Sequence, residues 1–215
     1  MIKAIVFDMD GVIIDSEYQH FLAWKQLFKK QKNVDLEEKD FQQLIGTLDQ
    51  YTVKNYFKKY HVRGNALKWR DKKKKIYKKL LQQKVKMFPG VKQVIIKLSK
   101  KYKVAIATSS WRKEAKIVVK KFKLQKYITK IIGKEDVRNH KPHPQIYQKM
   151  AKRLGVKEEE CVVIEDSIPG IIAAKRAKCK CIAVTNSYPA KKLKKADLIV
   201  KDLRNKKVSF FIQKN

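Results

Sequence analysis

Hydrophobic residues follow two different periodicities along the chain. Residues 2–7 form a short, β-branched apolar run that ends at Asp8, which predicts a buried strand. Through residues 16–87 apolar positions recur at helical spacing instead, as Phe21 and Trp24 do in the first stretch. This block is predicted to be all helical, with no strand inside it. Its four predicted helices lie near residues 16–30, 37–45, 50–60 and 66–85.

Beyond this block, strands and helices alternate. Phe88-Pro89-Gly90 marks the boundary, because proline and glycine end helices. Short apolar runs then alternate with segments of helical periodicity. The predicted strands are residues 104–108, 128–132, 162–165, 181–184 and 198–200. The predicted helices are residues 91–100, 113–122, 144–154 and 168–177.

This order of elements predicts an α/β fold. Strands separated by helices form parallel sheets with right-handed crossovers. We expect a Rossmann-like, doubly wound parallel sheet core with an inserted α-helical cap domain after the first strand. The predicted core comprises residues 1–15 and 88–215, and the predicted cap comprises residues 16–87.

Composition indicates the cellular setting. With 215 residues, of which 44% are hydrophobic, the chain can bury a sizeable core. Its apolar runs are too short or too often broken by lysine to span a bilayer, and its first residues do not resemble a signal peptide. Its three cysteines suit free thiols in a reducing compartment. We therefore expect a cytoplasmic protein with no membrane partner, and a monomer.

The net charge of +33 raises the alternative of a basic nucleic-acid-binding protein. Of the 53 basic residues, 46 are lysine and seven are arginine, whereas reading of base edges relies on the bidentate fork of arginine. The lysines are also spread over nearly every predicted helix. We expect no specific nucleic-acid partner, although this charge predicts nonspecific attraction to polyanions at low salt.

Four polar segments follow predicted strands, at the edge where parallel sheets bind ligands. Together they bring acids, hydroxyls and one lysine to this edge. The segments are Asp8-Met9-Asp10-Gly11, Thr108-Ser109-Ser110, His140-Lys141-Pro142 and Glu165-Asp166-Ser167.

The acids of these segments suit phosphoryl transfer. Asp8 can attack phosphorus in line and form an aspartyl-phosphate. Asp10, two residues later, can protonate the leaving alcohol and then deprotonate water. Carboxylates that face a phosphate dianion repel it unless a cation intervenes. We therefore expect Asp8, Asp10, Glu165 and Asp166 to bind Mg²⁺, a hard ion that prefers oxygen ligands.

The remaining polar residues can bind the phosphate. Thr108 and the backbone amides around Ser109 and Ser110 precede a predicted helix, where phosphoryl oxygens are readily held. Lys141 adds a compact positive charge against the crowded acids and the transition state. We also expect Ser110 to cap the helix that follows.

These motifs resemble the haloacid dehalogenase superfamily. Thr108, Lys141 and the pair Glu165-Asp166 are similar to its motifs two, three and four, in the same order. The resemblance covers residue 2 to about residue 185 and implies an enzyme that acts on a small phosphorylated metabolite. In having an acid at position 10, the chain resembles the phosphatases and mutases of the superfamily. Motif one is similar to Phe7-Asp8-Met9-Asp10-Gly11-Val12.

Within the superfamily the chain resembles β-phosphoglucomutase-like proteins. This resemblance rests on His20-Phe21-Leu22-Ala23-Trp24-Lys25 and on Glu165-Asp166-Ser167 with Gly170-Ile171. It implies that His20 lies near the cap hinge and helps to position Asp10. We also expect Gly46 to let a cap loop approach the active site closely, because glycine has no side chain.

Three departures from this subfamily favour a phosphatase. Ile45 stands where the mutases have lysine, and Asp49 stands where they have an arginine that binds the distal phosphate. Trp111-Arg112 replaces a Lys-Asn pair, and Arg112 is the residue that can replace the lost phosphate contact. A bisphosphate intermediate needs a second anion site, which an acid at position 49 would repel. We expect a phosphatase that acts on a sugar phosphate, with a hexose phosphomutase as the alternative.

Overall fold

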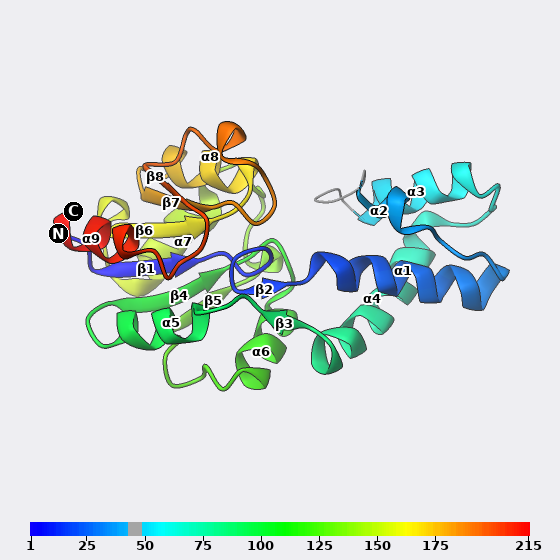
Figure 1. Cartoon of the computed structure of the whole chain (residues 1–215), viewed down its shortest axis with the longest axis horizontal. Helices are drawn as coiled ribbons and strands as arrows, with labels where there is room; N and C mark the ends of the chain where they lie inside the picture. The colour runs from blue at the N-terminus through cyan, green and yellow to red at the C-terminus, as the bar shows by residue number, and fades with distance from the viewer. Residues whose placement is uncertain (43–48) are drawn as a thin grey trace. The chain divides into compact units, whose positions relative to one another are not determined.

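The computed structural model describes residues 1–42 and 49–215 (Figure 1). The chain divides into two compact units. The first unit comprises residues 1–15 and 86–215, and the second comprises residues 16–85.

Within the described residues, the first unit contains a six-stranded parallel sheet (Figure 1). The strands lie in the order β5-β4-β1-β6-β7-β8, and every neighbouring pair is parallel. This topology confirms the predicted α/β fold class. The strands are β1 (Ala4–Phe7), β4 (Lys103–Ala107), β5 (Lys130–Ile132), β6 (Cys161–Glu165), β7 (Lys180–Val184) and β8 (Leu198–Val200).

Helices pack against this sheet. α7 and α8 contribute to one hydrophobic core with β1, β4, β6 and β7, while α5 contacts β4 and α9 contacts β8. The sequence pattern does not predict α9. No helix in the described part of the chain has the length and apolar character needed to cross a membrane. The helices are α5 (Val91–Ser99), α6 (Arg112–Lys121), α7 (Gln145–Leu154), α8 (Ile168–Arg176) and α9 (Lys206–Lys214).

The central strand β1 is buried along its whole length. Its side chains alternate between the two faces of the sheet, so both faces are covered. Ala4 and Val6 pack on the same face as Tyr147 of α7 and Ile171 of α8. The three cysteines are unpaired and buried in the first unit, as the sequence predicts. This packing fixes the position of the carboxyl end of β1, and Asp8 is the next residue.

A two-stranded antiparallel ribbon lies where the chain passes between the two units. β2 (Ile14–Asp15) pairs with β3 (Lys86–Met87), and the N–H of Phe88 donates to the carbonyl of Ile13. The prediction that residues 16–87 contain no strand is therefore wrong at Lys86–Met87. Two residues are too few to show an alternating pattern, so periodicity could not reveal this strand.

The second unit is helical in its described residues. Aromatic residues fill its core, where Phe28 of α1 packs against Tyr56 and Trp69 with ring centroids 5.6 Å and 4.7 Å away. Phe21 and Trp24 belong to the same cluster, so the predicted helical face of α1 is the buried one. The helices are α1 (Glu17–Lys32), α2 (Glu38–Gln42), α3 (Asp49–Lys59) and α4 (Ala66–Gln83).

Candidate active site

Asp8 is the first residue after the central strand β1. Its N–H donates to the carbonyl of Ile164 in β6 at 2.9 Å, which continues the sheet hydrogen bonding up to this residue. Its side chain is buried, and its Oδ1 accepts a hydrogen bond from Nζ of Lys141 at 2.6 Å. The sheet therefore fixes the backbone of Asp8, and a lysine from a distant loop neutralises its charge.

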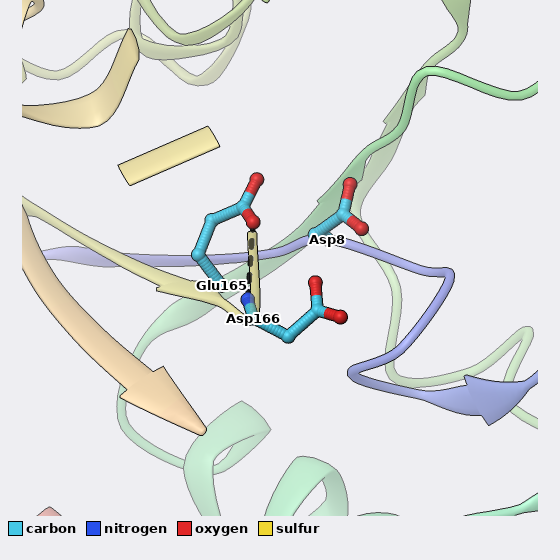
Figure 2. Close-up of side chains that lie close together, drawn as sticks. All are labelled: Asp8, Glu165 and Asp166. Atoms are coloured by element: carbon cyan, nitrogen blue, oxygen red, sulfur yellow. Dashed lines mark hydrogen bonds between the residues drawn. The ribbon is translucent and has the colours of Figure 1, made fainter. Parts of the chain in front are cut away.

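Three buried acids meet at the carboxyl ends of β1 and β6 (Figure 2). Asp8, Glu165 and Asp166 each offer a carboxylate oxygen, and these oxygens lie within 4.8 Å of one another. The dashed line in Figure 2 marks the hydrogen bond from the N–H of Asp166 to Oε2 of Glu165. We call Asp8, Glu165 and Asp166 the acidic group.

Burial makes ionisation of two of these acids unfavourable. It raises the pKa of Asp8 to about 8, and the charges of Glu165 and Asp10 add to this effect while Lys141 opposes it. Burial likewise raises the pKa of Asp166 well above its ordinary value, with the charges of Glu165 and Asp8 acting in the same direction. The site therefore has more negative charge than its own lysine can balance.

A hard cation fits this arrangement. Three carboxylates share a buried space with a single ammonium, that of Lys141, within hydrogen-bonding distance of Asp8 and Glu165. Carboxylate oxygens are the ligands that Mg²⁺ prefers, and such an ion offsets the repulsion between them. The donor set thus suits Mg²⁺ better than a softer metal, which would favour sulfur or imidazole.

Glu165 accepts five hydrogen bonds from donors in the described part of the chain. Its Oε1 accepts from Lys141 at 2.6 Å and from the hydroxyl of Tyr147 at 2.7 Å. Its Oε2 accepts from the N–H of Asp166 at 3.1 Å and from both the N–H and the hydroxyl of Ser167. Burial alone would raise the pKa of Glu165, but Lys141 and these donors lower it below its ordinary value. Glu165 is therefore held as an anion.

The carboxylate of Asp10 is directed toward the segment after β4. Its Oδ2 accepts hydrogen bonds from the hydroxyl of Ser110 at 2.7 Å and from that of Thr108 at 3.3 Å. The prediction that Ser110 caps the next helix is wrong, because Trp111 occupies the N-cap of α6. The N–H of Ser110 instead donates to Thr108 Oγ1 at 2.9 Å, which closes a turn that faces Asp10.

A loop that follows β7 completes the surroundings of the acidic group. The hydroxyl of Ser187 donates to Oδ2 of Asp166, and the side-chain amide of Asn186 donates to the carbonyl of Gly11 at 2.7 Å. Gly11 has a φ of +76°, and a Cβ there would lie 1.8 Å from Oδ2 of Asp166. Glycine is therefore required where the loop after Asp8 passes the acidic group.

Ser109 and Arg112 lie beside the same edge of the sheet. Ser109 is exposed after β4. The guanidinium of Arg112 donates to Oδ1 of Asp136 at 3.1 Å, and Arg153 donates to the same oxygen. In this structure Arg112 is thus held by an ion pair, and its predicted phosphate contact remains a hypothesis.

His20 and Asp49 belong to the second unit and share one partner there. Nζ of Lys73, which is buried, lies 2.5 Å from Nδ1 of His20 and 2.7 Å from Oδ1 of Asp49. The ring of His20 also stacks on Tyr77, with centroids 4.0 Å apart. The predictions for Gly46 and Ile45 lie outside the described residues.

Sequence reasoning does not assign Asn186, Ser187 or Tyr147, which the structure places at the site. Ser187 follows the carboxyl end of β7, and the rule that finds the other strand-end residues could have found it. Tyr147 gives no such signal, because its spacing on α7 is that of an ordinary core residue. Its contact with Glu165 becomes visible only in three dimensions.

Comparisons with known proteins agree with this geometry. The family described as haloacid dehalogenase-like hydrolase matches residues 5–184. The phosphorylated carbohydrates phosphatase of Thermotoga maritima is 32% identical over 188 residues, which are 81% of each chain. The β-phosphoglucomutase of Bacillus subtilis is 26% identical over 93% of this chain and 89% of its own.

The fold is also similar to that of a solved structure. The crystal structure of β-phosphoglucomutase from Clostridium difficile superposes with a TM-score of 0.78 at 26% identity, and the match covers 100% of this chain and 97% of that one. The match to the family includes Asp8, Thr108, Lys141 and the pair Glu165-Asp166. The chain belongs to the haloacid dehalogenase-like hydrolases, as its motifs predict.

Proposed function

We propose that this protein is a Mg²⁺-dependent phosphatase of a small phosphorylated metabolite, with a sugar phosphate as the substrate class. The observation that carries the proposal is the position of Asp8, which directly follows the central strand, contacts Lys141 and lies beside the other two acids. The name of the Thermotoga maritima relative, a phosphatase of phosphorylated carbohydrates, supports the substrate class.

In the first step Asp8 takes the phosphoryl group. One oxygen of its carboxylate attacks phosphorus, and the bond between phosphorus and the leaving alcohol oxygen breaks. Asp10 gives its proton to that oxygen. Lys141, 2.6 Å from Oδ1 of Asp8, stabilises the charge that develops as the acid and the phosphate approach each other.

In the second step water releases the phosphate. Asp10, now a carboxylate, takes a proton from a water molecule whose oxygen attacks phosphorus. The bond between phosphorus and Asp8 breaks, which restores the carboxylate and frees inorganic phosphate. The hydroxyls of Ser110 and Thr108 hold the carboxylate of Asp10 between these two proton transfers.

For the metal we propose Asp8 and Asp166 as carboxylate ligands. Both oxygens of Glu165 already accept hydrogen bonds, and Asp10 lies outside the acidic group whose carboxylate oxygens are within 4.8 Å of one another. We therefore assign Glu165 to the anchoring of Lys141, and Asp10 to proton transfer. When bound, Mg²⁺ supplies positive charge that offsets the repulsion between Asp8 and the phosphate.

The segment Thr108-Ser109, at the carboxyl end of β4, is proposed to hold the phosphoryl oxygens.

A hexose phosphomutase is the second candidate. It is favoured by the similarity to the β-phosphoglucomutases of Bacillus subtilis and Clostridium difficile. In such an enzyme an alcohol of a second sugar phosphate replaces water in the second step. Asp49 supports the phosphatase instead, because it stands where the mutases have an arginine that binds the distal phosphate, and it brings no positive charge for a second phosphate.

A phosphate-release assay tests the proposal. The protein is given a panel of sugar, glycolate and nucleotide monophosphates with Mg²⁺, and separately β-glucose 1-phosphate with its bisphosphate activator. We expect phosphate release that stops with EDTA and in Asp8→Asn, but continues in Asp202→Asn, a surface acid paired with Arg204. Formation of glucose 6-phosphate without phosphate release would favour the mutase. No product in either assay would contradict both functions.

A further inference from the structure

Tyr147 donates a hydrogen bond from inside the protein core to the acidic group. It lies on α7, its side chain is 1% exposed, and its hydroxyl is 2.7 Å from Oε1 of Glu165. Lys141 donates to that same oxygen at 2.6 Å. One carboxylate oxygen therefore receives both a neutral donor and a charged one.

Packing alone explains the ring of Tyr147 but not its hydroxyl. The ring belongs to the core cluster that also contains Val6 and Val163. A phenylalanine would fill the same volume, and it would not bring a polar group that requires a partner. The hydroxyl either finds an incidental partner in Glu165 or contributes to the placement of that carboxylate.

The surroundings of Glu165 favour the second interpretation. Oε2 is fixed by the N–H of Asp166 and by the N–H and hydroxyl of Ser167. Gly170 packs so closely that a Cβ at its position would lie 1.8 Å from Oε1. Donors at Oε2 and the close approach of Gly170 thus restrict the position of the carboxylate. Tyr147 supplies the neutral donor at Oε1.

The position of Oε1 matters because Lys141 bridges it to Asp8. Nζ of Lys141 lies 2.6 Å from Oε1 of Glu165 and 2.6 Å from Oδ1 of Asp8. All three side chains are at most 9% exposed, so water does not screen the attraction between them. A shift of Oε1 therefore moves the ammonium relative to Asp8.

We propose that Tyr147 is a positioning residue, whose hydroxyl holds Oε1 of Glu165 where it keeps the ammonium of Lys141 against Asp8. The role rests on the proposed phosphoryl transfer by Asp8. Without the hydroxyl, Oε1 interacts with Lys141 alone, and the ammonium is drawn toward Glu165. The acidic group then loses the arrangement that suits a cation and an attacking carboxylate.

The test compares Tyr147→Phe with Tyr56→Phe. Tyr56 is a matched control, because its hydroxyl is also buried, lies in the second unit and has no hydrogen-bond partner among the described residues. Mn²⁺ binding to each protein without substrate is measured by electron paramagnetic resonance, and kcat and KM are measured with Mg²⁺. For Tyr147→Phe we expect about a tenfold rise in the Kd for Mn²⁺ and about a tenfold fall in kcat, the size found for groups that orient metal-site residues. KM stays unchanged, and Tyr56→Phe behaves as the unaltered protein.

The outcomes separate this inference from the function on which it rests. If the unaltered protein binds Mn²⁺ and turns over, and Tyr147→Phe matches it in both, the positioning role is wrong and the proposed function stands. If the unaltered protein neither binds Mn²⁺ nor releases phosphate, the proposed function fails and the inference fails with it. A thermal melt of each variant shows that the proteins compared are folded.

A double-mutant cycle tests whether Tyr147 acts through Glu165. Tyr147→Phe, Glu165→Ala, which removes the acceptor of the tyrosine hydroxyl, and the combined variant are compared by their Kd for Mn²⁺. If the tyrosine acts through the glutamate, the combined variant binds no more weakly than Glu165→Ala alone. Two losses that multiply would show that Tyr147 acts independently, which would overturn the inference.

Discussion

The ammonium nitrogen of Lys141 lies 2.6 Å from an oxygen of Asp8, although 133 residues separate the two along the chain. The same nitrogen lies 2.6 Å from Glu165. Burial opposes the charge of Lys141, but the charges of Asp8 and Glu165 raise the pKa of its ammonium above the ordinary value. The lysine is therefore charged wherever the two acids are ionised, and it links the ends of β1 and β6.

Replacement of Lys141 by methionine should affect both stability and activity. The variant keeps most of the unbranched side chain but leaves two buried acids without their cation, which should cost about 3–5 kcal/mol of unfolding free energy. Loss of a charge that stabilises the transition state should lower kcat by about 10²–10³-fold. Denaturant unfolding and steady-state kinetics measure these two effects.

Lys175→Met is the matched control for this change. Lys175 pairs with Asp197 at 2.7 Å, but both side chains are partly exposed. Surface pairs of this kind contribute about 0–1 kcal/mol, so the control should lose little stability and no activity. Equal losses in the two variants would contradict the role of Lys141.

Binding of Mg²⁺ should strengthen as the pH rises toward 8. Burial raises the pKa of Asp8 to about 8 in the metal-free protein, so below that pH a proton occupies the carboxyl that the ion requires. Calorimetric titrations in buffers of different ionisation enthalpy should show release of protons on binding. They should also show an affinity that levels off above about pH 8. An affinity independent of pH between 6 and 8 would contradict the raised pKa of Asp8, because it would show that no ligand carboxyl takes up a proton in this range.

The metal-free protein should become less stable as the pH rises over the same range. Unfolded Asp8 ionises near its ordinary pKa of 3.8, whereas folded Asp8 ionises at about 8. Between these values the unfolded chain binds fewer protons than the folded one, so its unfolding free energy falls as the pH rises. Thermal melts in EDTA from about pH 5 to pH 8 should show this slope, and Asp8→Asn should reduce it. An equal slope in Asp8→Asn would assign the effect to other groups.

Gly170→Ala should disturb the acidic group. The added Cβ would lie 1.8 Å from Oε1 of Glu165, so the carboxylate or α8 must shift. Such overpacking costs about 1–3 kcal/mol, and we expect weaker Mn²⁺ binding together with the loss of stability. Titration with Mn²⁺ and denaturant unfolding measure the two effects.

Gly155→Ala is the control for this change, because it adds backbone strain without a contact to Glu165. Gly155 has a φ of +64°, and a Cβ added at this position would meet no atom within 4 Å. Alanine there therefore adds only backbone strain of about 1–2 kcal/mol. It should destabilise the protein while Mn²⁺ binding is retained. If Gly170→Ala also retains full Mn²⁺ binding, the close contact with Glu165 has no functional consequence.

Ser187→Ala should weaken the metal site without unfolding the protein. The hydroxyl of Ser187 donates to Oδ2 of Asp166, a proposed ligand, and groups that orient ligands typically change metal affinity by at least about tenfold. Ser209→Ala removes a hydroxyl that donates to the carbonyl of Lys206 in its own helix, and it should leave the Kd for Mn²⁺ unchanged. Identical Kd values for both variants would rule out an orienting role for Ser187.

The sequence predicts those parts of the site that depend on strand ends. Asp8, Thr108 and the pair Glu165-Asp166 each lie where a buried apolar run stops, and the carboxyl ends of parallel strands share one edge. The alternation of strands and helices is enough to predict that edge. The fold class follows from the same pattern, whereas the family follows from the resemblance of the motifs that contain these residues.

Other features depend on contacts that no local pattern encodes. Lys86–Met87 forms a strand only because Ile14–Asp15 lies opposite, and two residues carry no periodicity. Ser110 resembles a helix cap in sequence, yet its hydroxyl binds Asp10 from a loop 100 residues away. Arg112 pairs with Asp136, a partner that the sequence pattern does not indicate, and its predicted phosphate contact stays a prediction. These pairings are set by tertiary packing, which determines the partner of a polar side chain.

Detection of the phosphoryl group on Asp8 tests the central claim most directly. The protein, turning over the best substrate of the panel with Mg²⁺, is quenched in acid within milliseconds to seconds, digested and analysed by mass spectrometry. We predict one added phosphoryl group on the peptide that carries Asp8, formed at least as fast as turnover and absent in Asp8→Asn. Turnover with no modification of Asp8, or with the phosphoryl group on another residue, would contradict the account.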